Sequence, residues 1–189
     1  MDKEQQNPWI EGGKTLALSL VLALGIRSFI AEARYIPSES MLPTLEINDR
    51  LIIEKVSYRF KDPKRGEIIV FTPPNTARKC TPHQFSIDDN TPIKDAYIKR
   101  VVGLPGEEVR VENGVVYVND EPLAEDYINN EPDYRYGPVV VPENKYLVLG
   151  DNRMASCDSH IWGFVSQENI IGRAVVRFWP LNRLDATLD

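Results

Sequence analysis

Two serines that stand two residues apart are the first residues with catalytic potential. Ser38 and Ser40 lie between Pro37 and Pro43, shortly after a hydrophobic segment. Each proline biases the residue before it toward extended geometry, so we expect the serines to lie in an extended stretch. Side chains at positions i and i+2 of an extended chain face the same way. One hydroxyl would then attack a substrate atom while the other donates to the oxyanion that forms, although most serine and proline clusters are ordinary loops.

A serine nucleophile needs a base, and Lys99 is a candidate. On a strand, Tyr97, Lys99 and Val101 share one face, so Lys99 has apolar neighbours. A lysine with the ordinary pKa of about 10.4 is protonated at neutral pH, but burial disfavours the charge and lowers the pKa. A desolvated Lys99 would therefore be able to accept the proton of a serine. The alternative is an edge-strand lysine that reaches solvent.

A third segment, residues 150–163, is dense in small and turn-forming residues. Asp158 and His160 allow a Ser-His-Asp triad with Ser40, in which the imidazole takes the hydroxyl proton. The interpretation that we favour is a tight loop in which aspartate and asparagine side chains cap backbone groups.

The N-terminal region contains an apolar run over residues 15–26 that ends at Arg27. The run is short for a membrane span, which needs about 20 residues, and Ala31-Glu32-Ala33 is typical of a signal-peptide cleavage site. Cleavage there would leave the serines almost at a new terminus, where chains fray. We therefore expect a retained transmembrane anchor over residues 15–33, after a tail of residues 1–14. The flanking charges do not orient it.

The segments after the anchor have the periodicity of strands. Residues 109–112 and 115–118 flank Asn113-Gly114, a pair that favours the type I′ turn of a hairpin. Because the connections are short, we expect an all-β fold with antiparallel pairing and no helix beyond the anchor longer than a turn or two. Further strands are expected at 50–56, 67–71, 146–149 and 172–179, with a long surface loop at 73–93.

These strands predict an antiparallel β catalytic core with a smaller β subdomain inserted into it. The core comprises residues 34–103 and 146–189, and the inserted subdomain comprises residues 104–145. The length of 189 residues and the hydrophobic content of 42% suit one moderate domain of this kind.

Charge and composition exclude several classes of partner. The net charge of -6 argues against a nucleic-acid partner, which would require clustered basic residues. Two cysteines and two histidines do not supply a typical zinc site, so we expect no metal. A reaction carried by a serine and a lysine also needs no cofactor. Cys80 and Cys157 can form one disulfide if the domain lies in an oxidising compartment.

Taken together, the three chemical segments resemble type I signal peptidases, the membrane-bound Ser/Lys endopeptidases that remove signal peptides. The resemblance rests on residues 37–45, on residues 99–106, and on residues 150–153 with Ser156 and residues 158–159. It covers nearly the whole chain after the first dozen residues, and the pattern is closest to the thylakoidal processing peptidase branch.

The resemblance implies a role for each matched residue. Ser40 would be the nucleophile, Lys99 the general base, Ser38 an oxyanion donor, and Ser156 the hydroxyl that orients Lys99. Asp158 would pair with Arg100. The residues expected near the pockets for small substrate side chains are Ile36, Met41, Leu45, Tyr97, Ile98 and Cys157, and those expected to support the site are Arg100, Gly150, Asp151, Asn152 and Asp158.

A Cys80–Cys157 disulfide would tie the 73–93 loop to the active-site edge and make activity sensitive to reduction. The implied substrates are preproteins with Ala-x-Ala-like cleavage sites, and the other partners would be the lipid bilayer and an export translocon. The implied location is a plasma or thylakoid membrane, with a single span and the catalytic domain on the exported side, which is periplasmic, extracellular or lumenal.

Two alternatives remain on sequence grounds. One is a self-cleaving Ser/Lys regulator, although the chain has neither a helix-turn-helix pattern nor a basic face. The other is a secreted, non-enzymatic β module with a cleavable signal.

Overall fold

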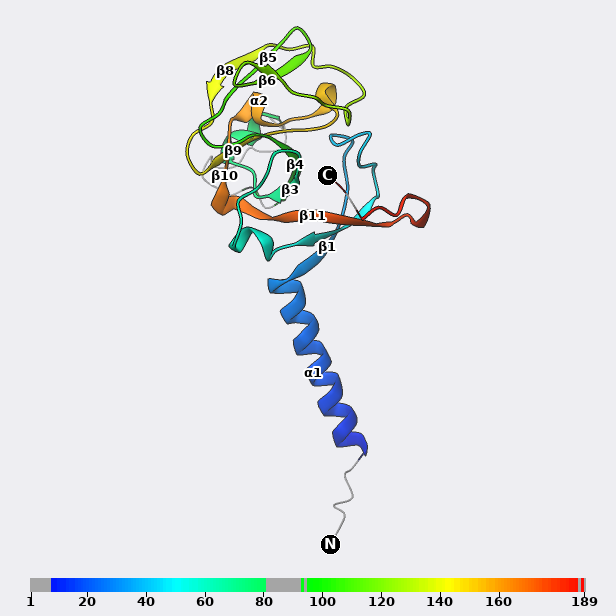
Figure 1. The fold of residues 1–189 in the computed structure, drawn as a ribbon. Helices are drawn as coiled ribbons and strands as arrows, with labels where there is room; N and C mark the ends of the chain where they lie inside the picture. The colour runs from blue at the N-terminus through cyan, green and yellow to red at the C-terminus, as the bar shows by residue number, and fades with distance from the viewer. Residues whose placement is uncertain (1–7, 81–92, 94, 187, 189) are drawn as a thin grey trace.

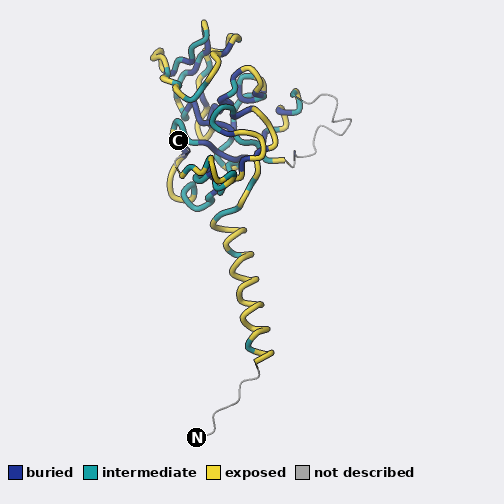
Figure 2. The backbone as a smooth tube through the Cα atoms, turned by 90° about the vertical axis from the view of Figure 1, so that its right-hand side faces the viewer, coloured by how far each residue is buried: buried dark blue, intermediate teal, exposed yellow. Residues whose placement is uncertain are grey.

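The computed structural model describes residues 8–80, 93, 95–186 and 188. Its first element is a long helix, α1, which spans Pro8–Phe29 and projects from the rest of the molecule (Figure 1). Its 22 residues extend about 33 Å at about 1.5 Å per residue. In length and composition α1 suits a membrane span, and none of its residues is buried (Figure 2).

The helix lies earlier in the chain than the predicted anchor at residues 15–33. Residues 31–33 instead begin strand β1, Ala31–Tyr35, which pairs with strand β2, Arg50–Glu54. The apparent cleavage site Ala31-Glu32-Ala33 is therefore part of a sheet. Its backbone groups form hydrogen bonds with β2, and this pairing satisfies them.

The junction between α1 and the domain has no linker. The Ile30 carbonyl accepts a hydrogen bond from the Lys55 backbone N–H at 2.8 Å. Lys55 Nζ lies 2.6 Å from Glu32 Oε2, and Arg59 Nη2 donates to the Phe29 carbonyl at 3.3 Å. These contacts fix the direction in which the helix leaves the sheet.

The larger sheet has seven strands in the order β1-β2-β11-β3-β4-β9-β10, and the adjacent strands are antiparallel. It confirms the antiparallel all-β prediction. The remaining strands of this sheet are β3 (Ile68–Phe71), β4 (Tyr97–Gly103), β9 (Lys145–Leu149), β10 (Val165–Ser166) and β11 (Ile170–Trp179).

A smaller sheet lies at the end of the domain farthest from α1 (Figure 1). Its order is β7-β6-β5-β8, and all four strands fall within residues 104–145. Asn113 and Gly114 have φ angles of 51° and 81°, as a type I′ hairpin turn requires. The strands are β5 (Glu108–Glu112), β6 (Val115–Val118), β7 (Glu121–Pro122) and β8 (Tyr136–Val140).

Beyond α1 the described chain contains only short helices, as predicted. The longest is η2, a 3₁₀-helix at Asn75–Cys80, which buries Ala77. It lies inside the predicted 73–93 loop, of which residues 81–92 fall outside the described part. The others are α2 (Ser159–Trp162), η1 (Ser57–Arg59), η3 (Arg153–Ala155), η4 (Gln167–Asn169) and η5 (Leu181–Arg183).

Apolar strand residues form the core, which contains no residue of α1. Burial alternates along β2, β5 and β6, whereas consecutive residues are buried in β3, β4 and β9. One cluster joins Met41 and Leu45 to β2 and β3. Another joins Val109 of the small sheet to Leu147 of β9. The first cluster anchors the serine segment, and the second packs the two sheets together.

Candidate active site

The serine segment is a turn rather than the extended stretch that we expected. The Leu42 N–H donates to the Glu39 carbonyl at 3.0 Å, and the Leu45 N–H donates to the Met41 carbonyl at 2.9 Å. Burial of Met41 and Leu45 favours this conformation, because both side chains enter the core. The turn brings the Ser38 and Ser40 hydroxyl oxygens within 3.4 Å of each other. The hydroxyls therefore converge as predicted, but not through strand geometry.

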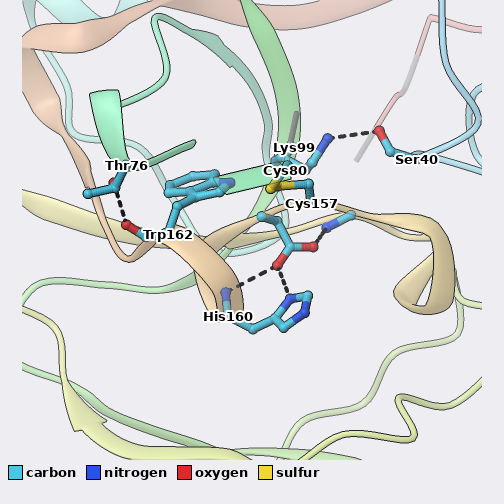
Figure 3. Close-up of a disulfide and its surroundings, with 9 residues drawn as sticks. Ser40, Thr76, Cys80, Lys99, Cys157, His160 and Trp162 are labelled. Atoms are coloured by element: carbon cyan, nitrogen blue, oxygen red, sulfur yellow. Dashed lines mark hydrogen bonds and ion pairs between the residues drawn. A yellow bond between two sulfur atoms is a disulfide. The ribbon is translucent and has the colours of Figure 1, made fainter. Parts of the chain in front are cut away.

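Lys99 lies on β4, between β3 and β9, and is 4% exposed. It is therefore not the edge-strand lysine of the alternative interpretation. Its ammonium nitrogen Nζ lies 2.8 Å from Ser40 Oγ and 2.8 Å from the Ile98 carbonyl oxygen. Figure 3 shows the Lys99 and Ser40 side chains pointing toward one another.

Burial lowers the pKa of Lys99 to about 8, because the charged amine is separated from water. The carboxylates of Asp158 and Asp151 act in the opposite direction and favour the charged form. Desolvation outweighs them, so a substantial fraction of Lys99 is neutral in mildly alkaline solution. A neutral amine 2.8 Å from a serine hydroxyl can accept its proton.

The 150–158 segment is a tight loop held by polar groups, the interpretation that we favoured. Asp158 accepts a hydrogen bond from the Gly150 N–H at 2.9 Å. The Asn152 N–H donates to the Ser40 carbonyl at 3.1 Å, and its side-chain amide donates to the Glu39 carbonyl at 3.2 Å. This loop therefore supports the serine turn directly.

The predicted pairing of Asp158 with Arg100 is wrong. Arg100 lies next to Lys99 on β4 and points to the opposite face, where Nε and Nη2 donate to both oxygens of Asp151 at 2.9 and 2.8 Å. Thr44 Oγ1 also donates to Asp151, at 2.5 Å. Asp158 instead faces the Gly150 N–H and His160.

Ser156 does not orient Lys99 by a hydrogen bond. Its hydroxyl is buried and makes no hydrogen bond within the described part of the chain. The backbone carbonyl of Ile98 takes the place that we assigned to Ser156. Ser156 Oγ packs closely against Gly150: a Cβ atom added to Gly150 would lie only 2.2 Å from this oxygen. The Ser156 hydroxyl therefore lies where the 150–158 loop closely approaches the serine turn.

The alternative triad with His160 does not form. His160 Nδ1 lies 2.7 Å from Asp158 Oδ1, and its ring stacks on Tyr134 with the centroids 4.0 Å apart. The hydrogen bond of Ser40 Oγ is with Lys99 Nζ instead, and His160 lies apart from that pair (Figure 3).

A cavity of about 620 Å³ opens beside the two serines and Lys99. Of the predicted pocket residues, Ile36, Tyr97, Ile98 and Cys157 line it. Met41 and Leu45 do not line it; their side chains pack in the core cluster with β2 and β3. The full lining is Arg34, Tyr35, Ile36, Pro37, Ser38, Ser40, Leu51, Ile53, Val70, Cys80, Asp95, Ala96, Tyr97, Ile98, Lys99, Ala155 and Cys157.

The two cysteines form a disulfide, with their Cα atoms 6.1 Å apart. The disulfide links the end of η2 to the residue after Ser156 (Figure 3). Both cysteines line the cavity. Among the described residues no three His, Cys, Asp or Glu side chains gather as a metal site would require.

Sequence reasoning missed three groups that support the site. Thr44 stands inside the serine motif and bonds Asp151, so its position was a usable signal. Glu125 and Tyr127 reach the site from the connection between β7 and β8, and no local pattern indicates that contact.

The fold and the site define a class of protein. A serine hydroxyl bonded to a buried lysine, beside a cavity on a β domain that carries an apolar helix, is the arrangement of an anchored Ser/Lys hydrolase. The family model described as "Signal peptidase, peptidase S26" matches residues 9–179. The chain belongs to this family, and it is a membrane-anchored serine endopeptidase that removes signal peptides.

Several known proteins match most of this chain. A signal peptidase I of Leptolyngbya laminosa is 60% identical over 94% of this chain and 83% of its own length. A probable signal peptidase I-2 of Synechocystis sp. is 56% identical over 97% of this chain and 79% of its own length. A probable thylakoidal processing peptidase 2 of Arabidopsis thaliana is 42% identical over 92% of this chain and 45% of its own length.

Among solved structures, a signal peptidase I from Enterococcus faecalis V583 covers 60% of this chain and 97% of its own. It has 30% identity and a TM-score of 0.45. The family match sets aside both alternatives from the sequence, the self-cleaving regulator and the non-enzymatic module.

Proposed function

We propose that Ser40 and Lys99 form the catalytic dyad of this signal peptidase. The observation that carries the proposal is the 2.8 Å contact between Lys99 Nζ and Ser40 Oγ at the edge of the cavity. The pKa of Lys99, about 8, supports the role of base, since about half of the amine is neutral at that pH.

In the first half-reaction Lys99 takes the Ser40 proton as Oγ attacks the carbonyl carbon of the scissile peptide. The resulting tetrahedral intermediate collapses when the C–N bond breaks and Lys99 passes its proton to the leaving amine. An ester to Ser40 remains. Lys99 then takes a proton from water, the hydroxide attacks the ester carbonyl, and Ser40 leaves with the returned proton.

Two donors are available to the oxyanion of each tetrahedral intermediate. One is the Ser38 hydroxyl, 3.4 Å from Ser40 Oγ. The other is the Ser40 backbone N–H, which no hydrogen bond takes within the described part of the chain. A single donor of this kind contributes about 2.7–4 kcal/mol in a well-measured case.

The cavity would select small side chains at P1 and P3, as in Ala-x-Ala sites. Ile36, Tyr97 and Ile98 line it with apolar surface, and the disulfide through Cys157 limits its width. A confined apolar pocket excludes bulk more strongly than it distinguishes small groups.

The proposed arrangement keeps the catalytic core at 34–103 and 146–189 on the exported side of the bilayer, with residues 104–145 as an inserted β subdomain. The single helix α1 would cross a plasma or thylakoid membrane. Preproteins would reach the enzyme from an export translocon, so that site and substrate meet at the same surface.

The test is cleavage of a detergent-solubilised preprotein with an Ala-x-Ala site by the wild-type chain, Ser40→Ala, Lys99→Ala and Ser38→Ala. We expect the first two variants to be inactive and Ser38→Ala to lose about 10²–10³-fold in kcat. Activity in Lys99→Ala but not in Ser40→Ala would assign the base to another residue. A substrate with leucine in place of the P1 alanine should resist the wild-type enzyme, and its efficient cleavage would contradict the proposed pocket.

A further inference from the structure

A buried ion pair joins the small sheet to the active-site loop. Glu125 lies in the connection between β7 and β8, and its carboxylate accepts hydrogen bonds from Arg153 Nη1 at 2.8 Å and Nη2 at 2.5 Å. The side chains of Arg153 and Glu125 are 0% and 6% exposed. The Tyr127 hydroxyl donates to the same carboxylate at 2.7 Å. The pair is therefore isolated from water and its geometry is fixed.

Arg153 transmits this contact to the nucleophile. Its Nε donates to the Gly150 carbonyl at 3.0 Å, so the guanidinium holds both Glu125 and the start of the loop. Asn152, which lies between Gly150 and Arg153 in the same loop, donates its N–H to the Ser40 carbonyl at 3.1 Å. Glu125 is thus connected to Ser40 through the Arg153 side chain, its hydrogen bond to the Gly150 carbonyl, and one backbone hydrogen bond from Asn152 to Ser40.

A second contact runs in parallel. The Tyr127 ring lies 4.0 Å from the guanidinium carbon of Arg100, within the range of a cation–π interaction. Arg100 holds Asp151 through two hydrogen bonds, and Asp151 accepts from Thr44 in the serine turn. The β7–β8 connection therefore supports the turn from both ends.

We infer that residues 123–128 brace the catalytic turn, and that Glu125 and Tyr127 are positioning residues for Ser40. The inference rests on the proposed role of Ser40. It gives the small sheet a task in the reaction, which is to set the distance and angle of the hydroxyl relative to Lys99. A displacement of about 1 Å at a reacting group can cost about 10²-fold in rate, so a brace of this kind acts on kcat.

The main variant is Glu125→Gln, which keeps the size of the side chain but leaves the Arg153 charge without its partner. The matched control is Asp120→Asn. Asp120 pairs with Arg110 at 3.1 Å near the same sheet, but it is 83% exposed. We expect Glu125→Gln to lower kcat about 10- to 100-fold with KM within about twofold of wild type, while Asp120→Asn keeps both constants.

Because loss of a buried charge partner can prevent folding, Tyr127 provides an independent pair of variants. Tyr127→Leu removes the ring from Arg100, whereas Tyr127→Phe keeps it. We expect Tyr127→Leu to lower kcat, and Tyr127→Phe to restore most of it. Equal kcat for wild type and Tyr127→Leu would overturn this arm of the brace.

Amide hydrogen exchange in the intact chain separates positioning from general stability. In Glu125→Gln we expect faster exchange in residues 150–156 and 38–42, with unchanged exchange in strands β5 and β6. Faster exchange confined to the small sheet, with wild-type kcat, would overturn the inference. Ser40→Ala serves as the reference: if it cleaves like the wild type, the proposed nucleophile is wrong, whatever the brace variants do.

Discussion

Lys99 illustrates how one buried side chain is adapted to two chemical requirements. β-strand alternation places it between Tyr97 and Val101, and burial lowers the pKa of its amine to about 8. The nearby carboxylates of Asp151 and Asp158 keep the pKa from falling further. The amine is therefore basic enough to take a proton from serine and still neutral often enough to do so.

The pH dependence of cleavage should follow this ionisation. Only neutral Lys99 can accept the Ser40 proton, so kcat/KM should rise with pH by about tenfold per unit below pH 8 and level off above it. A pH series with a peptide substrate measures this. An inflection near pH 6.5 would indicate a histidine base instead.

Stability should change with pH in the same range. The folded-state pKa of Lys99 lies below its value of 10.5 in an unfolded chain, so the unfolded state binds more protons between pH 8 and 10.5, and the folded state gains stability as pH rises. The shift corresponds to about 3 kcal/mol. Urea titrations give the free energy of unfolding of the wild type and of Lys99→Met. We expect the difference between these two free energies to change by about this amount from pH 8 to 10.5. Parallel pH profiles would contradict the lowered pKa.

Among the structural elements, the serine turn and the 150–158 loop depend on close backbone approach. A Cβ added at Gly150 would lie 2.4 Å from the Ser40 carbonyl oxygen and 2.6 Å from Ser156 Cβ. The loop has no space for it, so the two segments would have to separate.

Gly150→Ala should therefore abolish most cleavage and lower Tm by several degrees, since overpacking costs about 1–3 kcal/mol. Gly25→Ala is the control, because nothing lies within 4 Å of a Cβ added there. Preprotein cleavage and thermal unfolding measure the two effects. Wild-type activity in Gly150→Ala would mean that the contact between the segments is not needed.

The disulfide connects η2 to the edge of the active site, so we expect reduction to lower activity several-fold. Cys157 follows Ser156 and lines the cavity, and its release would widen the pocket wall. Cleavage rates with and without dithiothreitol measure the effect. The Cys80→Ser/Cys157→Ser double variant should be slow in both conditions. Unchanged activity and unchanged mobility on a non-reducing gel would count against the prediction.

The sequence predicts elements whose signals are local. The Asn113-Gly114 hairpin follows from turn chemistry, and the structure has it. The strand expected around Lys99 is also present, but residues 99–103 of β4 are buried on both faces. The same reasoning misplaced the serines in an extended stretch, because the burial of Met41 and Leu45 decided the backbone there. The family resemblance implied that Asp158 pairs with Arg100. Asp151 is the partner instead, and only the packed loop distinguishes the two nearby aspartates.

At the scale of the whole molecule, the direct junction between α1 and β1 sets where the catalytic site stands relative to the bilayer. The Lys55 and Arg59 contacts hold the end of the helix against the sheet. The position of Ser40 relative to the end of α1 is therefore a fixed property of the fold.

Insertion of a six-residue Gly/Ser linker between Ile30 and Ala31 should test this. We expect the variant to cleave a short soluble peptide in detergent at the wild-type rate, because the sheet and cavity are unchanged. Cleavage of a membrane-embedded preprotein in liposomes should fall, because the site no longer stands at a fixed height. Equal rates on the embedded substrate would show that this height does not matter.

The core contains no residue of α1, and no residue of this helix is buried (Figure 2). The free energy that folds the β domain therefore owes nothing to burial of the helix. On the proposed topology, the domain would fold without help from the helix after it has crossed the membrane, and a change of lipid would alter the position of the helix without loosening the catalytic domain. We therefore expect that α1 can be replaced by another apolar helix of similar length without loss of the cleavage activity.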